Sequence, residues 1–214
     1  MKIVFATMNE HKVAELRQML AGLCAEIGLE IVSMAEFGDL ADVVETEVTF
    51  TGNAMLKART IAAATGLPAL ADDSGLSVKA MGGSPGVFSS RWSGSRAGAA
   101  LSRAERDRAN IALLLDQLDE VADKYRDASF VCAAVFALPN GLVRTAEGQM
   151  HGRLAREPRG TNGFGYDPIF IPVDQPAGEE RTLGEFTDAQ KNAISHRGRA
   201  MRRMAPHIRE LLTQ

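Results

Sequence analysis

Cysteine is scarce in this chain of 214 residues, which contains Cys24 and Cys132 and no other. Both lie in apolar sequence surroundings, so we expect core thiols, as in a protein of the reducing cytoplasm, rather than a disulfide. The spacing of Cys and His residues does not match a metal-binding motif. The sequence therefore favours a cytoplasmic protein without a disulfide framework or a structural zinc.

Long apolar runs and a strong net charge are also missing. No stretch of about 18 uncharged apolar residues occurs, so no membrane span is expected. Charged residues return within "MKIVFATMNEHK", too soon for the apolar core of a signal peptide. Lys and Arg total 24 against 27 Asp and Glu, a net charge of -3, which argues against nucleic-acid binding through bulk charge. We therefore expect neither a membrane nor a nucleic acid as a partner.

The chain has no Ser/Gly-rich linker and no internal repeat, so we expect residues 1–214 to form a single α/β catalytic domain. Apolar residues make up 45% of it, enough to bury a sizeable core. Strand and helix patterns alternate, which predicts a mixed sheet flanked by helices, with two lobes around a cleft as one arrangement. The predicted strands are 2–6, 29–33, 69–71, two long strands joined at Asn140-Gly141, and 168–171. Beyond the third strand, 75–81 is expected to continue as extended chain. The predicted helices cover about 10–23, 50–64, 102–118 and 195–212.

The first candidate site is "ATMNEHK", which follows the first strand and opens a helix. Thr7 and Asn9 supply polar side chains, and Lys12 supplies a positive charge. Together with the free N–H groups of a helix start, they suit a bound phosphate. The glycines of a P-loop are missing. The alternative is a plain N-cap at Asn9 and a solvated lysine, which the spacing alone favours.

The second candidate is a set of acidic residues at the ends of different elements. Glu45 and Glu47 precede the second predicted helix, and Asp72 and Asp73 end the short strand "ALA". Carboxylates gathered in this way suit a hard cation such as Mg²⁺. The alternative is that Asp72 caps a turn and both glutamates are solvated. That alternative is weakest for Asp73, because neighbouring carboxylates at a buried strand end need a cation or hydrogen-bond donors.

The third candidate is "GTNGFGYDPIF", in which glycines alternate with Phe164, Tyr166 and Asp167. Glycine lets a backbone approach a ligand closely, and an aromatic ring can stack on a base. The alternative is a glycine turn with core aromatics, and the two interpretations are about equally supported by this stretch alone.

The fourth candidate is the start of the last helix, "QKNAISHRGRAMRRM". Lys191, His196 and Arg197 could bind phosphate or hydrogen-bond the edge of a base. The alternative is a solvated basic helix face, which fits Arg199, Arg202 and Arg203 better than His196 and Arg197.

Six motifs in order give the chain a resemblance to a known family. They are T-x-N-x-x-K (7–12), E-T-x-x-T-F-x-x-N-A (45–54), A-D-D-S-G-L (71–76), G-G-x-P-G-x-x-S (82–89), G-x-G-Y-D-P-I-F (163–170) and I-S-H-R-G (194–198). Each is weak alone, but the ordered set is specific and resembles the Ham1/inosine triphosphatase family over nearly the whole chain. One departure is Gly52, where the family often has Glu ahead of Asn-Ala.

This resemblance implies an elongated mixed sheet in two lobes with a central cleft, usually as a homodimer. It implies Mg²⁺-assisted hydrolysis of a purine nucleoside triphosphate (dITP, ITP or XTP) to the monophosphate and pyrophosphate, which sanitises the nucleotide pool. Carried over by motif, the residues for the triphosphate are Thr7, Met8, Asn9, Glu10, His11 and Lys12, with Lys57 nearby. Glu45 and Asp73 serve the metal, Asp73 is also the base, and Ser74 contacts substrate. The base is held by Phe164, Gly165, Tyr166 and Asp167, and its 6-keto edge is read by Lys191, His196 and Arg197.

Two other functions stay open at this point. One is a Maf-like pyrophosphatase that acts on pyrimidine or modified nucleotides. The other is a nucleotide-sensing or RNA-binding module without turnover. The acidic set argues against the second, because an RNA-binding protein gains affinity from basic charge.

Overall fold

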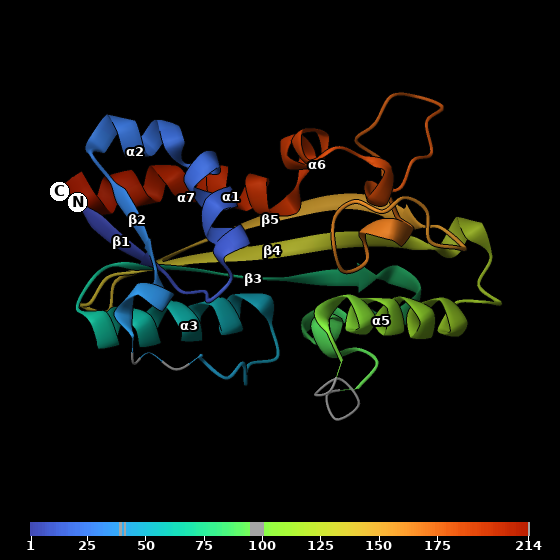
Figure 1. Cartoon of the computed structure of the whole chain (residues 1–214), viewed down its shortest axis with the longest axis horizontal. Helices are drawn as coiled ribbons and strands as arrows, with labels where there is room; N and C mark the ends of the chain where they lie inside the picture. Colours follow the sequence, from blue (N-terminus) through green and yellow to red (C-terminus); the bar gives the residue numbers. More distant parts are fainter. Residues whose placement is uncertain (39, 41, 95–100, 214) are drawn as a thin grey trace. The chain divides into compact units, whose positions relative to one another are not determined.

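The computed structural model describes residues 1–38, 40, 42–94 and 101–213, without the side chain of His11. Its strands are β1 (Lys2–Phe5), β2 (Glu30–Ser33), β3 (Ala69–Val78), β4 (Asp127–Ala137), β5 (Val143–Leu154) and β6 (Phe170–Pro172). They form one sheet in the order β2-β1-β3-β4-β5-β6 (Figure 1). β1 is parallel to β2 and β3, whereas β5 and β6 are antiparallel. The predicted mixed α/β fold with helices on the sheet is therefore confirmed.

The described α-helices are α1 (Glu10–Met19), α2 (Ala21–Ile27), α3 (Phe50–Thr65), α5 (Arg103–Gln117), α6 (Asp188–Ile194) and α7 (His196–Thr213). Among the residues that the structure describes, no helix is long and apolar enough to cross a membrane. Cys24 and Cys132 are both free thiols, and Cys132 is buried in the core as predicted, whereas Cys24 is only half-buried.

The chain divides into two compact units, each built from separate segments. Unit 1 comprises Met1–Ser74, Cys132–Gly148 and Arg197–Gln214. Unit 2 comprises Gly75–Val131 and Gln149–His196. The unit boundaries fall inside β3, β4 and β5 and after the first residue of α7, so no linker marks them in the sequence.

Unit 1 buries both faces of its part of the sheet. In β1, Ile3 and Phe5 belong to a core cluster with residues of α1, α2 and α7, whereas Val4 packs in a second cluster with α3. β3 follows the same alternation, with Leu70 in the first cluster and Ala71 in the second. Figure 1 shows α3 on one face and α1, α2 and α7 on the other. Successive residues of a strand in unit 1 therefore face different helices.

Unit 2 has a core of its own around α5. Leu114 of α5 packs in one cluster with Leu76 of β3, Phe130 of β4 and Tyr166. Ser102 caps α5 and forms a capping box with Glu105, as expected from a serine before an apolar helical pattern.

Two predictions of local structure were wrong, and one helix was not predicted. The expected helix over 10–23 is two helices, α1 and α2, because the chain leaves the helical conformation at Leu20 while the apolar stripe continues across the break. The short helix α6, capped by Thr187, was not predicted. The strand predicted over 69–71 instead runs from Ala69 to Val78. It therefore includes 75–78, the first part of the stretch expected to be extended, and also Asp72 and Asp73. Their charges are compensated by side chains, so they do not end the strand.

Candidate active site

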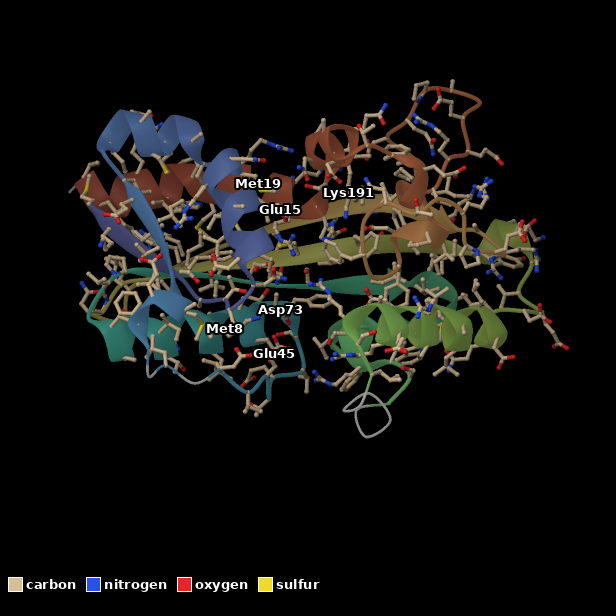
Figure 2. All side chains as sticks on the ribbon, in the orientation of Figure 1. Met8, Glu15, Met19, Glu45, Asp73 and Lys191 are labelled. Atoms are coloured by element: carbon tan, nitrogen blue, oxygen red, sulfur yellow. The ribbon has the colours of Figure 1, made fainter. Side chains whose placement is uncertain are left out.

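Asp72 and Asp73 are adjacent in β3 and point to opposite faces of unit 1. The side chain of Asp72 lies on the same face of β3 as that of Leu70 and binds side chains from α1 and α7. The side chain of Asp73 lies on the same face of β3 as that of Ala71 and binds side chains from α3. Figure 2 shows Asp73 and Glu45 on the side of α3, and Glu15 on α1 at the other face. Strand geometry therefore separates the two carboxylates that the sequence places side by side.

Asp72 forms a buried ion-pair network. Its Oδ2 accepts a hydrogen bond from Nε of Arg197 at 3.1 Å, and Nζ of Lys12 lies 3.4 Å from its Oδ1. Arg197 also donates from Nη1 to Oε2 of Glu15 at 2.8 Å. Burial alone would raise the pKa of Asp72, but the charges of Lys12 and Arg197 outweigh it and hold that pKa well below its usual range. Asp72 is therefore ionised and fully engaged by its neighbours.

Asp73 has a different environment, in which Asn53 and Lys57 of α3 are its partners. Nδ2 of Asn53 donates to Oδ2 of Asp73 at 3.1 Å, and Nζ of Lys57 lies 3.6 Å from Oδ1. The same Lys57 nitrogen donates to Oε1 of Glu45 at 2.8 Å. Burial raises the pKa of Asp73, and the nearby charge of Lys57 opposes that shift without cancelling it. A carboxylate with a raised pKa suits the acceptance of a proton near neutral pH.

The sequence of α3 explains why it can hold this group. Thr49 caps the helix by accepting the Gly52 N–H, and Gly66 ends it in the left-handed conformation. Asn53 and Lys57 are four residues apart and lie on one helix face. Both are buried among the apolar residues of that face. Each therefore aims a polar group at β3 from the same stripe that packs the core.

The carboxylates of Glu45 and Asp73 suit a divalent cation whose remaining ligands include phosphate oxygens of a substrate. In the described part of the chain, no three His, Cys, Asp or Glu side chains form a closed metal cage. Glu45 and Asp73 are instead linked through one ammonium group, that of Lys57. Mg²⁺ commonly binds through one or two carboxylates and completes its shell with water and substrate oxygens. Two convergent carboxylates meet that requirement.

Gly52 leaves space that Glu47 fills. A Cβ at position 52 would lie 2.8 Å from Cβ of Glu47 and 2.9 Å from Oγ1 of Thr49. A glutamate at this position would therefore require Glu47 to move. Glu47 itself is exposed, as the alternative interpretation of this residue predicted.

The segment from Thr7 to Lys12 forms the turn into α1. Oγ1 of Thr7 accepts the N–H of Asn9 at 3.2 Å, and Oδ1 of Asn9 accepts the N–H of Lys12 at 3.4 Å, which confirms Asn9 as an N-cap. Met8 is 52% exposed and Glu10 is also exposed. The side chain of His11 lies outside the described residues. Ser74 follows Asp73 in β3 and is half-buried.

In unit 2, Asp167 organises the glycine-rich loop. Its Oδ2 accepts the N–H of Phe164 at 2.7 Å and lies 2.6 Å from Nζ of Lys191. Burial raises the pKa of Asp167, and the charge of Lys191 opposes that shift. Gly163 has a φ of 77°, and a Cβ there would lie 2.1 Å from Oδ2 of Asp167. The loop therefore needs glycine at 163 for both its backbone conformation and its packing.

The two aromatic residues of this loop differ in exposure. Phe164 is 42% exposed, and its ring centroid lies 4.3 Å from Nζ of Lys191 and 4.9 Å from Cζ of Arg103. Tyr166 is buried in the core of unit 2 and donates its hydroxyl to the carbonyl of Ser89 at 2.9 Å. Phe164 is thus available for stacking on a ligand, whereas any ligand contact from Tyr166 would come from its backbone.

His196 and Arg197 are consecutive but belong to different units. The ring of His196 stacks on Phe130 in unit 2, with centroids 5.0 Å apart and an interplanar angle of 12°. Arg197 is 5% exposed and belongs to the network of Asp72 in unit 1. These contacts favour a structural role for Arg197, and its contact with a base stays a prediction.

Comparisons with known proteins lead to the same family as the resemblance of the six motifs. The family model described as the Ham1 family matches residues 3–207. The chain belongs to the Ham1 family. A relative from Streptomyces avermitilis, named dITP/XTP pyrophosphatase, is 50% identical over 211 residues, which cover 99% of this chain and 98% of that protein. A relative of the same name from Frankia alni is 50% identical over 213 residues and the full length of both chains. The solved structure of a HAM1 protein from Coxiella burnetii is 40% identical, with a TM-score of 0.84 over 98% of this chain and 99% of that one.

Within this Ham1 chain, two site residues were missed by sequence reasoning. Asn53 contacts Asp73 directly, and Asp107 of α5 accepts the N–H of Gly165 at 2.9 Å. The signal for Asn53 was present, because a polar residue lies four positions before Lys57 on the apolar face of a helix. No comparable signal marks Asp107, which lies in a charged stretch of α5.

Proposed function

We propose that this member of the Ham1 family hydrolyses dITP, ITP and XTP to the nucleoside monophosphate and pyrophosphate. The observation that carries the proposal is the buried carboxylate of Asp73, held beside Lys57 and Glu45. Its support is the full-length similarity to relatives named dITP/XTP pyrophosphatase. Removal of such nucleotides would keep non-standard bases out of the nucleotide pool.

The triphosphate is the part of the substrate that the group in unit 1 suits. The start of α1 offers backbone N–H groups, and Lys12 and Lys57 offer positive charge. We assign the triphosphate contacts to Thr7, Met8, Asn9, Glu10, His11, Lys12 and Lys57, with Ser74 as a further substrate contact. Glu45 and Asp73 would hold Mg²⁺, which when bound neutralises phosphate charge and polarises a phosphoryl oxygen.

Asp73 is the proposed general base. As a water oxygen bonds to the α-phosphorus, the bond from that phosphorus to the bridging oxygen breaks and pyrophosphate leaves. The water proton passes to a carboxylate oxygen of Asp73. Burial raises the pKa of this group, which makes it a stronger base than an exposed aspartate. Lys57 offsets part of the negative charge that the transition state gathers.

The base of the nucleotide is assigned to the loop in unit 2. Phe164 would stack on it, Gly165, Tyr166 and Asp167 would line it, and Lys191, with His196 and Arg197, would face the 6-keto oxygen. Asp167 already holds Lys191 in place at 2.6 Å. Adenine carries an amino donor at this position, so a donor from the protein would reject ATP.

Two further parts of the proposal rest on the resemblance. We propose that the chain forms a homodimer and acts in the cytoplasm. A dimeric mass in solution at micromolar concentration supports the first, and a monomeric mass contradicts it. Enzyme activity in the cytosolic fraction of the source cells supports the second.

The test of the activity is a substrate panel with and without Mg²⁺. We expect pyrophosphate from dITP and XTP, much less from dGTP and dATP, and a loss of turnover when Mg²⁺ is chelated. Equal turnover of pyrimidine nucleotides would favour the Maf-like alternative. Tight binding of ITP without pyrophosphate release would favour a nucleotide sensor.

A further inference from the structure

Asn53 links the segment that carries Glu45 to the strand that carries Asp73. Its Oδ1 accepts the backbone N–H of Glu47 at 2.9 Å, and its Nδ2 donates to Oδ2 of Asp73 at 3.1 Å. The residue is 0% exposed. The side chain of Asn53 therefore connects the backbone of Glu47, two residues after Glu45, with the carboxylate of Asp73.

Both ends of this link fix the orientation of the amide. A backbone N–H can only donate, so it requires the carbonyl oxygen of Asn53, and an ionised carboxylate can only accept, so it requires the NH₂ group. An ionised aspartate at this position would keep the first bond and lose the second, because it has no proton to donate to Asp73. Alanine would lose both. Asparagine meets both requirements without adding charge.

Lys57 makes a second link between the same two elements, one helical turn further along α3. Its ammonium lies 2.8 Å from Glu45 and 3.6 Å from Asp73. The charged link of Lys57 can be exchanged for a cation or a phosphate when a ligand binds. The hydrogen bond from the backbone N–H of Glu47 to Asn53 is neutral, so we expect it to persist when a ligand binds.

We propose that Asn53 is a positioning residue that fixes the separation of Glu45 and Asp73 for the reaction. Although the inference rests on the proposed function, the link itself is independent of any activity. Partners of this kind, which orient the ligands of a metal, typically matter by about 10- to 100-fold in affinity or activity.

An asparagine of α5 whose described hydrogen bonds do not involve Glu45, Glu47 or Asp73 provides a matched control for the amide exchange. Asn110 is 2% exposed, accepts the N–H of Ser93 through Oδ1 at 2.8 Å and donates from Nδ2 to the carbonyl of Ser89 at 3.3 Å. It is as buried and as fully bonded as Asn53, but its partners lie in unit 2. Asn110→Ala therefore reproduces the loss of a buried amide without touching Glu45 or Asp73.

The experiment combines amide hydrogen exchange with steady-state kinetics on dITP. For Asn53→Ala we expect exchange of the Glu47 amide to accelerate by about tenfold or more, because its acceptor is gone. We expect kcat to fall by about 10- to 100-fold and KM to change by less than about threefold. Asn110→Ala should leave Glu47 exchange at the wild-type rate.

Asn53→Asp separates the two bonds and fills the same volume, so it carries the test even if Asn53→Ala does not fold. We expect wild-type protection of the Glu47 amide together with a kcat as low as that of Asn53→Ala. Wild-type kcat in folded Asn53→Asp, or unchanged Glu47 exchange in folded Asn53→Ala, would overturn the proposal. A wild-type protein without activity on dITP would instead refute the proposed function and leave the exchange result valid.

Discussion

The carboxylates of Asp72 and Asp73, adjacent in β3, face opposite sides of unit 1 and bind different helices. Asp72 pairs with Arg197 of α7 and Lys12 of α1, whereas Asp73 contacts Asn53 and Lys57 of α3. Opposite pKa shifts follow, downward for Asp72 and upward for Asp73. We infer that Asp72 stabilises the fold and that Asp73 acts as the general base.

Asp73→Asn should remove activity and keep the fold. The change keeps the shape of the side chain and removes its charge, and loss of a general base or metal ligand lowers kcat by about 10² to 10⁴-fold. Burial penalises the charged carboxylate, so the melting temperature at pH 7 without Mg²⁺ should hold or rise. Near-normal turnover at saturating Mg²⁺, or unfolding that explains the loss, would refute the role of Asp73.

Asp72→Asn should have the reverse effect. It leaves the buried guanidinium of Arg197 with Glu15 as its remaining carboxylate partner in the described structure. Loss of one partner from a buried pair costs about 3–5 kcal/mol of stability. We expect a lower free energy of unfolding in urea, with a smaller loss of kcat than for Asp73→Asn in the fraction that stays folded.

The stability contribution of Asp72 should depend on pH in one direction. The folded-state pKa lies below the value of about 3.9 for an unfolded aspartate. The contribution is therefore fully present above that unfolded value and is lost as the pH falls toward the folded one. Urea unfolding of wild type and Asp72→Asn from pH 7 to pH 2.5 should show a difference that narrows below about pH 4. A difference that grows toward acid pH would contradict the assignment.

Lys57→Met should make the folded protein more responsive to Mg²⁺. Without the ammonium, Glu45 and Asp73 repel each other at neutral pH, and a divalent cation relieves that repulsion. We expect a lower melting temperature than wild type in EDTA and a larger rise on addition of Mg²⁺. Lys79→Met is the control, because the side chain of Lys79 is 82% exposed and its salt bridge to Asp127 is long, at 3.9 Å. Equal responses of both variants would argue against a cation site at Glu45 and Asp73.

Phe164→Ala should raise KM for dITP without abolishing turnover. Stacking of a base on an aromatic side chain contributes about 1–3 kcal/mol, or roughly 5- to 150-fold in KM. Tyr125→Ala is the matched control, since Tyr125 is 59% exposed and carries Lys124 over its ring at 4.8 Å. An unchanged KM in Phe164→Ala would remove this ring from the base site.

His196→Ala should narrow the ratio of dITP to dATP activity. We expect the lower ratio to come mainly from a loss of dITP turnover, because the variant lacks the donor that we propose to face the 6-keto oxygen. Arg197→Ala should instead lower the melting temperature, because it breaks the ion pairs with Asp72 and Glu15. Equal loss on both nucleotides in His196→Ala would assign that residue to phosphate binding or structure.

Local sequence patterns predicted much of the fold. The apolar run of β1, the helix from Phe50 with its glycine stop, and the Asn140-Gly141 turn between β4 and β5 all follow from short-range rules. The sequence left two lobes open as one arrangement but could not show where the two units divide, because segments of each unit alternate along the chain. Local patterns depend on residues that are close in sequence, so they give no sign of a unit boundary that falls inside a strand.

The sequence also could not predict ion pairs between residues that are far apart along the chain. Asp72 and Arg197 are 125 positions apart, and Asp72 and Lys12 are 60 apart. The motif placed both acidic residues at a strand end, although the strand continues through them to Val78. Once the strand is known to continue, strand alternation alone assigns the two carboxylates to different faces.

The central claim is water attack at the α-phosphorus of dITP, with pyrophosphate as the leaving group. Hydrolysis in ¹⁸O-labelled water, followed by mass spectrometry of both products, tests it most directly. We predict one ¹⁸O atom in dIMP and none in pyrophosphate, and a loss of both products in Asp73→Asn. Label in pyrophosphate, or release of orthophosphate with dIDP, would contradict the mechanism.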